Sequence, residues 1–306
     1  MIEYYKKTVR QKKLERVEDY TRGCWVKVIN PNSTEIDFLV DKFKLDKDLL
    51  FDGLDVYEIP RIEEEGSKAY IYLTMPTSKI PNEYTSSFLI IVSKNLLITV
   101  SKSNLELFDK IVSTRKDFLT NNQTRSLLQI LLFLSNSYAA DIRKIMKEVK
   151  KDRRNIKKLN DKDILDLVLQ EDRLNEYLSS FSPLINLHAT MLKLKSVSFK
   201  EDEKEFIEDL IVDLNQTLSS CKSALKTISN MRDYYSTTLS HNLNKILGVL
   251  TIFTVFLTIP AVISGIYGMN IKLPLQNVKS AFWILGGIVL MIWVIAIIGL
   301  KRAKVI

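Results

Sequence analysis

The chain has 306 residues, a net charge of +8 and two cysteines, Cys24 and Cys221. Two distant cysteines exclude a disulfide framework, and no nucleophile elbow, kinase motif set or His-Glu-x-x-His motif supports an enzyme. Apolar residues make up 46% and charged residues 26%, but most of the continuous hydrophobicity lies after position 245. We therefore expect a charged soluble part followed by membrane-spanning segments.

Residues 1–120 are predicted to form an α/β head. The N-terminal "MIEYYKKTVRQKKLERV" is charged throughout and lacks the apolar core of a signal peptide, so the head is expected in the cytosol. "GCWVKVINP" predicts a strand that ends at Pro31, and "STEIDFLVDKF" predicts a helix capped by Asn32 or Ser33. "AYIYLTM" and "SFLIIVSKNLLITVS" predict strands, the second folded into a hairpin at Ser93-Lys94-Asn95.

A helical hairpin region over 121–200 and a helical stalk over 201–245 are predicted to follow, because glycine and proline are almost absent there. The hairpin region contains a basic run, Asp141 to Lys158, with nine basic and three acidic residues. Such a run suggests an anionic partner. No zinc-finger spacing, phosphate loop or RNA-binding motif accompanies it, so a solvated helix face is favoured and nucleic acid is not expected as a partner.

The stalk has apolar or small residues at alternating steps of three and four, which is coiled-coil spacing. These residues are Ile207, Ile211, Leu214, Leu218, Cys221, Leu225, Ile228, Tyr235, Leu239 and Ile246. Nothing interrupts the pattern before the first apolar segment. One helix from about Glu201 to Tyr267, on the order of 100 Å long, is therefore predicted. About five such helices could bundle around an axis and continue into the bilayer.

Two segments are predicted to cross a membrane. Residues 246–267 and 280–300 contain 22 and 21 residues without a charge. At 1.5 Å per residue, each can cross a hydrocarbon layer of roughly 30 Å. Lys245 precedes the first span and the basic tail 301–306 follows the second, so the positive-inside rule places both chain ends in the cytoplasm. The loop 268–279 is then external, and the predicted location is the cell membrane.

The first span carries a polar seam. Steps of three and four place seven residues on one face: Asn244, Leu247, Thr251, Thr254, Thr258, Ala261 and Gly265. The threonines either bond to their own helix backbone and pack against a neighbouring helix, or line a pore. Hydroxyls and an amide suit an ion that keeps its water shell, as Mg²⁺ does. Leu247 and the nearby Leu250 would form apolar rings that gate by dewetting.

The stretch "NLNKILGVLTIFTVFLTIPAVISGIYGMN" ends in Gly268-Met269-Asn270, and a second span then closes the chain. With this signature the chain resembles the CorA family of magnesium transporters over nearly its whole length. "WVKVINP" and "FKLDKDLLFDGLDVYEIPRIE" resemble the cytoplasmic domain of that family. The resemblance implies a homopentameric funnel whose first span lines the pore. It also implies that Gly268, Met269 and Asn270 form the selectivity filter, where the Asn270 amides bind the hydrated ion.

The resemblance further implies regulatory sites at which carboxylates of neighbouring copies bind cytoplasmic Mg²⁺ and hold the channel closed. The matching positions are Asp52 and Asp233, and Asp209 is a weaker candidate. Mg²⁺ would then be both the transported ion and the regulatory ligand. Facing carboxylates repel one another and a hard cation relieves that repulsion, so loss of the ion favours opening. The alternative is that these aspartates are ordinary surface charges.

The sequence departs from its apparent relatives in and near the pore. Pro260 falls one residue later than in some relatives, Ala261 stands where a hydroxyl is frequent, and Thr258 stands where a bulky apolar residue is frequent. The external loop carries Lys272 and Lys279 but no acid. Pore width and ion preference therefore stay open.

Two histidines complete the candidate residues. His188 lies on a mostly apolar helix without a second ligand at metal spacing, so a structural histidine is expected. His241 is expected to face solvent.

Three functions remain. The first is a Mg²⁺ influx channel closed by intracellular Mg²⁺, and the second is a related transporter of Co²⁺, Ni²⁺ or Zn²⁺, including an exporter. The third is a membrane-anchored coiled-coil scaffold or sensor without transport. The intact Gly-Met-Asn motif favours the first, and the threonine seam together with Asn270 disfavours the third.

Overall fold

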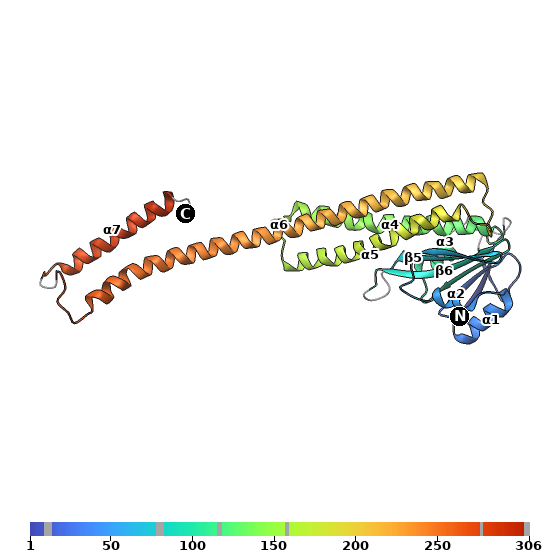
Figure 1. The fold of residues 1–306 in the computed structure, drawn as a ribbon, viewed down its shortest axis with the longest axis horizontal. Helices are drawn as coiled ribbons and strands as arrows, with labels where there is room; N and C mark the ends of the chain where they lie inside the picture. Colours follow the sequence, from blue (N-terminus) through green and yellow to red (C-terminus); the bar gives the residue numbers. More distant parts are fainter. Residues whose placement is uncertain (9–13, 78–82, 115–117, 157–158, 276–277, 303–306) are drawn as a thin grey trace. The chain divides into compact units, whose positions relative to one another are not determined.

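The computed structural model describes residues 1–8, 14–77, 83–114, 118–156, 159–275 and 278–302. The chain forms two compact units, Met1–Met231 and Arg232–Ile306. Helix α6 (Glu201–Tyr267) contributes to both units. The sheet and helices α1 to α5 belong to the first unit, and α7 (Ala281–Arg302) belongs to the second (Figure 1).

The first unit is built on a seven-stranded sheet in the order β2-β1-β3-β7-β6-β5-β4. Strands β3 and β7 pair in parallel, and the other neighbouring strands pair antiparallel. The strands are β1 (Ile2–Lys6), β2 (Glu15–Val17), β3 (Trp25–Ile29), β4 (Arg61–Glu65), β5 (Lys68–Pro76), β6 (Thr85–Ser93) and β7 (Leu96–Ser101).

Both faces of this sheet are covered, and β5 shows why its sequence is apolar at nearly every position. Ala69, Ile71 and Leu73 enter one apolar cluster, whereas Tyr70 and Tyr72 enter the other. Alternate residues of a strand point to opposite faces. A strand with helices on both sides therefore has a continuous apolar run instead of an apolar–polar alternation.

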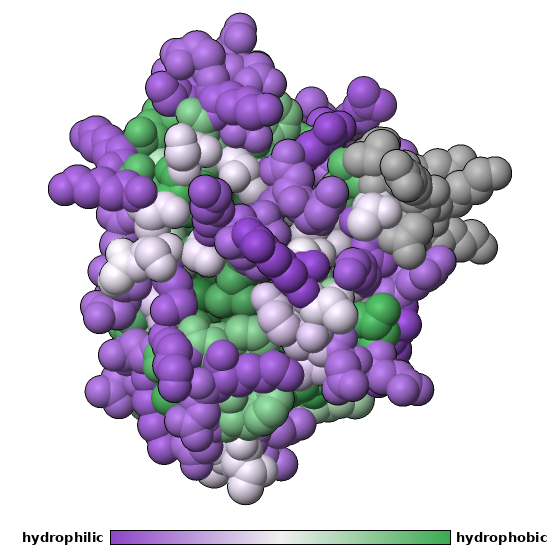
Figure 2. Space-filling model, turned by 90° about the vertical axis from the view of Figure 1, so that its right-hand side faces the viewer, coloured by the Kyte–Doolittle hydropathy of each residue, from purple (hydrophilic) through white to green (hydrophobic). Residues whose placement is uncertain are grey.

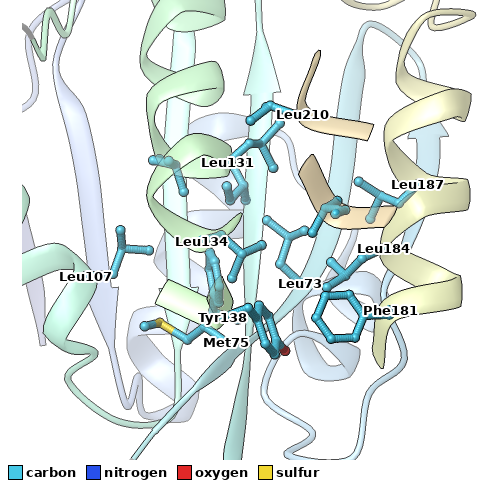
Figure 3. Close-up of a cluster of buried hydrophobic side chains, with 14 of the residues drawn as sticks. Leu73, Met75, Leu107, Leu131, Leu134, Tyr138, Phe181, Leu184, Leu187 and Leu210 are labelled. Carbon is cyan, nitrogen blue, oxygen red and sulfur yellow. The ribbon is translucent and has the colours of Figure 1, made fainter. Parts of the chain in front are cut away.

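Helices form a layer on each side of the sheet (Figure 1). Helices α1 (Ser33–Phe43) and α2 (Lys47–Asp52) pack on one side through Ile36, Leu39 and Leu50. The other layer contains α3 (Glu106–Thr114), α4 (Gln123–Arg154), α5 (Asp161–Met191) and the first part of α6. In Figure 3, Leu73 and Met75 of the sheet lie beside side chains of these helices: Leu131, Leu134, Tyr138, Phe181 and Leu184. The face of this unit that Figure 2 shows carries mostly hydrophilic residues at its surface.

The local sequence signals of the head are confirmed. Asn32 caps α1, and its side chain and that of Glu35 form a reciprocal capping box. Strands β6 and β7 form the predicted hairpin around Lys94 and Asn95. Strand β3 ends at Ile29, before the predicted end at Pro31, because Asn30 adopts a positive φ of 43° that takes the chain out of the sheet.

Strand β1 was not predicted, because its segment has a highly charged sequence. Tyr4 and Tyr5 are nevertheless buried. Glu3 is also buried and lies near Lys27 of β3 and Arg16, at 4.0 and 3.2 Å. A charged segment can enter a sheet when its charges meet partners there. Strands β2 and β4 and helices α2 and α3 were likewise not predicted.

The long helix α6 has the predicted bounds, but the use of its apolar stripe differs. Ile207, Leu214, Cys221 and Ile228 are buried within the first unit, together with residues of α4 and α5. The chain itself covers much of this stripe up to Met231, so the bundling of α6 with other copies stays a prediction that would need another face of the helix there. Further along, the predicted positions are open: Leu239 is 51% exposed and Ile246 is 63% exposed.

The basic run lies on the second half of α4, where Arg143, Lys147, Lys150 and Arg154 are exposed. This agrees with the favoured interpretation, a solvated helix face. Its last two residues, Lys157 and Lys158, and tail residues 303–306 lie outside the described residues.

Candidate ion pathway

Within the described part of the chain, two helices, α6 and α7, are long and apolar enough to cross a membrane. The qualifying segments are the apolar part of α6 and Ala281–Gly299 of α7, and no residue of either apolar stretch is fully buried. Phe253, Leu257 and Ile295 are examples of large apolar side chains left exposed. Water does not favour such a surface, so lipid or further protein must cover it.

Helix α7 lies along one face of α6. Trp293 Nε1 donates a hydrogen bond to the carbonyl oxygen of Phe256 at 3.1 Å, and the two aromatic rings are 5.6 Å apart. Partly buried residues of α6 recur at helical spacing on this face: Gly248, Ile252, Phe256, Ile259, Ile263 and Tyr267.

The predicted polar seam lies on the opposite face of α6. At about 100° per residue, Thr251, Thr254 and Thr258 point roughly 140° to 160° away from Phe256. All seam residues are exposed in the single chain, as is the neighbouring leucine: Asn244, Leu247, Leu250, Thr251, Thr254, Thr258, Ala261 and Gly265. The structure thus brings the seam together as one continuous face and leaves it uncovered by α7.

The threonine hydroxyls bond to their own helix. Thr251 donates to the Leu247 carbonyl at 2.8 Å, Thr254 to the Leu250 carbonyl at 2.9 Å, and Thr258 to the Thr254 carbonyl at 2.8 Å. This is one of the two arrangements considered from sequence, and it is compatible with the other. A hydroxyl that has donated its hydrogen still has lone pairs that accept hydrogen bonds. The seam therefore offers acceptors to whatever lies against it.

The Gly-Met-Asn motif follows directly after the end of α6. The N–H of Gly268 donates to the Ser264 carbonyl at 2.9 Å, and that of Met269 donates to the Ile266 carbonyl at 3.2 Å. A Cβ at position 268 would lie 3.2 Å from the Ser264 carbonyl oxygen, a crowded approach that glycine avoids. Met269 and Asn270 are exposed, and the Tyr267 hydroxyl donates to the Pro274 carbonyl at 3.1 Å, which ties the loop to the helix end.

Asp52 has a cationic partner within its own chain. Its carboxylate lies 2.8 Å from Arg61 Nη2 and its side chain is 46% exposed. Arg61 also pairs with Glu58 and with Glu63, and its guanidinium lies 4.2 Å from the centre of the Tyr72 ring. Burial opposes protonation of Arg61, but the hydrogen bonds that Arg61 donates to the Glu58 and Glu63 carboxylates outweigh this effect and raise its pKa. The head therefore presents Asp52 as part of a mainly acidic cluster around one arginine.

Asp209 and Asp233 are exposed positions on α6, one in each unit. Across the described residues, no group of three or more His, Cys, Asp or Glu side chains is placed to hold a metal ion. A metal at Asp52, Asp209 or Asp233 would need ligands from another copy or from water. The regulatory role of these aspartates stays a prediction.

His188 is fully buried, and its predicted structural role stays a prediction. Its Nδ1 lies 2.7 Å from the Leu184 carbonyl oxygen, whereas Nε2 is buried without a hydrogen-bond partner in the described structure. Burial lowers the pKa of His188, and the hydrogen bond to the Leu184 carbonyl partly offsets this decrease. His241 is exposed, as expected.

Two functional neighbours were missed from sequence. Arg61 lies nine residues after Asp52, in "FDGLDVYEIPR", and no spacing rule links them. Trp293 lies on an apolar helix, where any of its large side chains is an equal candidate to meet α6. Only the packed structure pairs these residues.

An α/β unit, one long helix that runs into a span and a second apolar helix define a membrane protein with two spans. The chain belongs to the CorA family: the model of the "CorA-like Mg2+ transporter protein" family matches residues 21–302.

Curated relatives match over most of their length. The cobalt/magnesium transport protein CorA of Methanocaldococcus jannaschii is 26% identical over 97% of this chain and 96% of its own. The magnesium transport protein CorA of Campylobacter jejuni strain RM1221 is 21% identical over 91% and 90%.

Solved structures show the same fold. The complete structure of the CorA magnesium transporter from Methanocaldococcus jannaschii matches with a TM-score of 0.86 and 21% identity, over 100% of this chain and 99% of that one. The structure of the full-length CmaX protein matches with a TM-score of 0.77 and 15% identity, over 98% and 97%. The predicted family and fold class are confirmed, while the homopentamer stays a prediction.

Proposed function

We propose that this chain carries Mg²⁺ across the cell membrane through a pore lined by the polar seam of α6, which we call the threonine face after Thr251, Thr254 and Thr258. The observation that carries the proposal is the position of this face, which is continuous, exposed and directed away from α7. Hydroxyl and amide groups directed into lipid tails would gain no hydrogen bonds there. A water-filled path gives them partners.

The chemistry of the face suits a hydrated cation. Water bound to Mg²⁺ uses its oxygen for the ion and presents its hydrogens outward, so the wall has to accept hydrogen bonds. Thr251, Thr254 and Thr258 have already donated their hydrogens to backbone carbonyls and present acceptor lone pairs. Asn270, exposed just beyond the end of α6, adds an amide oxygen at the mouth. Mg²⁺ loses its water reluctantly, which favours such outer contacts.

One α6 face cannot enclose a path, so the pore needs several copies. The family resemblance implies five, arranged with the threonine faces inward. The exposed apolar positions of α6 beyond Met231 would then meet neighbouring copies or lipid. We further propose inward flux with both chain ends in the cytoplasm, in keeping with the excess of Lys and Arg at Lys245 and after the second span.

Regulation by intracellular Mg²⁺ would act at Asp52 and Asp233, with Asp209 as a weaker candidate. The acidic cluster around Arg61 supports this role, because three carboxylates share one guanidinium and keep an unbalanced negative charge. A Mg²⁺ ion between this cluster and a carboxylate of another copy would neutralise that charge. Co²⁺ is the second candidate cargo, since the Methanocaldococcus jannaschii relative is a cobalt/magnesium transport protein.

The test is Mg²⁺ uptake into proteoliposomes by the wild type and Asn270→Ala, with Co²⁺, Ni²⁺ and Zn²⁺ as competitors. Ile271→Ala, the next exposed residue of the same loop, is the matched control. We expect uptake by the wild type and the control, and its loss in Asn270→Ala. Uptake by Asn270→Ala at the wild-type rate would contradict the filter, and the absence of flux for every ion would favour a scaffold.

A further inference from the structure

Pro260 removes one backbone hydrogen bond from the middle of the first span. Proline has no N–H, so it cannot donate to the carbonyl four residues earlier, which is that of Phe256. Helix α6 nevertheless continues through Pro260 to Tyr267. In the hydrocarbon region no water replaces the missing donor, and an unpaired carbonyl there is strongly unfavourable.

Trp293 of α7 donates to this same carbonyl. The distance from Trp293 Nε1 to the Phe256 carbonyl oxygen is 3.1 Å. The indole N–H can only donate, so a backbone carbonyl is a suitable partner. The Phe256 and Trp293 rings also pack at 5.6 Å with an angle of 42° between their planes, which orients the indole.

We propose that Trp293 is a positioning residue for the pathway: it satisfies the carbonyl that Pro260 leaves free and so holds the proline-containing turn of α6 in place. Without this donor the turn would relax towards another partner for the carbonyl, by bending or rotating. Kinks in helices arise where the regular backbone bonds are interrupted in this way.

The turn held by Trp293 carries residues of the threonine face. Thr258 and Ala261 lie within two residues of Pro260, on the side of α6 directed away from α7. A change in the angle of the helix at Pro260 would move these two positions relative to Thr251 and Thr254 before it. Helix α7, which packs on the opposite side of α6, would thus determine the shape of the pathway. This last step rests on the proposed function, whereas the pairing of Trp293 with the freed carbonyl does not.

A double-mutant cycle of Trp293→Phe and Pro260→Ala tests the pairing. Trp293→Phe keeps an aromatic ring but removes the donor. Pro260→Ala restores a backbone N–H at position 260, so the Phe256 carbonyl regains a helical partner and no longer needs the indole. Trp283→Phe is the matched control, because Trp283 is on the same helix and is 78% exposed.

The first readout is the unfolding equilibrium of the full chain in mixed detergent micelles. We expect Trp293→Phe to lower the folding constant about threefold, the typical strength of an interhelical hydrogen bond in membrane proteins. In the Pro260→Ala background the same substitution should have little effect, and Trp283→Phe should have little effect in either background. An equal loss from Trp293→Phe with and without the proline would show that only ring packing matters, and would overturn the pairing.

The second readout is the ratio of Mg²⁺ to Co²⁺ uptake in proteoliposomes. We expect Trp293→Phe to change this ratio and the double variant to match Pro260→Ala alone. A folding defect with an unchanged ratio would overturn the positioning role.

Two further outcomes separate the pairing from the proposed function. If the wild type transports neither ion while the folding cycle is non-additive, the proposed function fails and the pairing holds. If Trp293→Phe does not insert at all, its recovery by added Pro260→Ala supports the pairing, and a failure to recover contradicts it.

Discussion

The two units of the chain treat the same kind of residue in opposite ways. In the first unit, apolar side chains are buried on both faces of the sheet and along α6 up to Met231. In the second unit, the same helix exposes Leu247, Leu257 and others, and the contact with α7 covers one face. The pattern of apolar residues alone therefore does not predict whether protein or lipid covers them. The first unit folds around its own core, whereas the second needs lipid or further protein to cover its apolar surface.

The hydroxyl groups of the two units also differ in burial. In the first unit the Tyr138 hydroxyl donates to the Thr74 carbonyl and lies 3.2 Å from the Thr74 hydroxyl, fully buried. In the second unit the threonine hydroxyls bond backward to their own helix and remain exposed. The buried hydroxyls of the first unit bond within its packing, whereas the threonine hydroxyls of the second unit keep exposed lone pairs.

The largest expected effect comes from truncating matched leucines in the two units. Leu134 is fully buried in the core of the first unit, whereas Leu257 of the first span is 59% exposed. We expect Leu134→Ala to lower the free energy of unfolding by about 2–5 kcal/mol, through lost burial and a residual cavity. Leu257→Ala should lower it by less than about 1 kcal/mol in detergent, because detergent already covers this side chain. Chemical denaturation followed by circular dichroism compares the two variants. Equal losses in the free energy of unfolding would contradict the difference in burial between the two units.

Acid should destabilise the first unit through His188. The folded-state pKa lies below the unfolded value, so the unfolded state binds more protons and stability falls as pH drops below about 6.5. Each pH unit of that fall costs up to about 1.4 kcal/mol until the folded-state pKa is reached. His188→Leu should flatten the stability profile between pH 7 and 5, measured by thermal unfolding. A wild-type profile no steeper than that of His188→Leu would contradict this account.

Thr254→Val tests whether the hydroxyls of the threonine face contribute to Mg²⁺ uptake. Valine has nearly the same shape but no lone pairs, so we expect Mg²⁺ uptake to fall roughly fivefold, the loss of about 1 kcal/mol from one hydrogen bond. Thr227→Val is the control, because the Thr227 hydroxyl makes the same backward bond, to Ser223, in the first unit. Both variants should unfold like the wild type. Equal uptake by the two variants would place the pathway elsewhere.

The smallest effect on stability is expected for Asp52→Asn. The pair with Arg61 is half exposed and Arg61 keeps Glu58 and Glu63, so the loss should be about 0.5 kcal/mol or less. The regulatory proposal predicts a separate change: Mg²⁺ should protect wild type from proteolysis more than it protects the variant. Asp37→Asn, which removes the carboxylate of another exposed ion pair of the head, that with Lys47, serves as the control. Identical protection of wild type and Asp52→Asn would argue against a Mg²⁺ ligand at this position.

Features that depend on residues close together in the chain could be predicted from the sequence. The start of α1 near Asn32 or Ser33, the hairpin between β6 and β7, and the bounds of α6 follow from caps, turns and periodicity over a few positions. The polar face of the first span also follows, because a helix of known pitch places Thr251, Thr254 and Thr258 on one side. The family assignment rested on a contiguous motif, and the comparisons bear it out.

Tertiary structure decided the pairings between distant residues. Strand β1 enters the sheet because β3 supplies partners for its charges, Asp52 meets Arg61 across a loop, and Trp293 reaches a carbonyl 37 residues earlier. It also decided that the stalk stripe up to Met231 is covered by α4 and α5 of the same chain. Periodicity shows that a helix has an apolar face, but the burial of that face depends on which other segment reaches it. That choice is made by the packing energy of the whole fold, to which every element contributes.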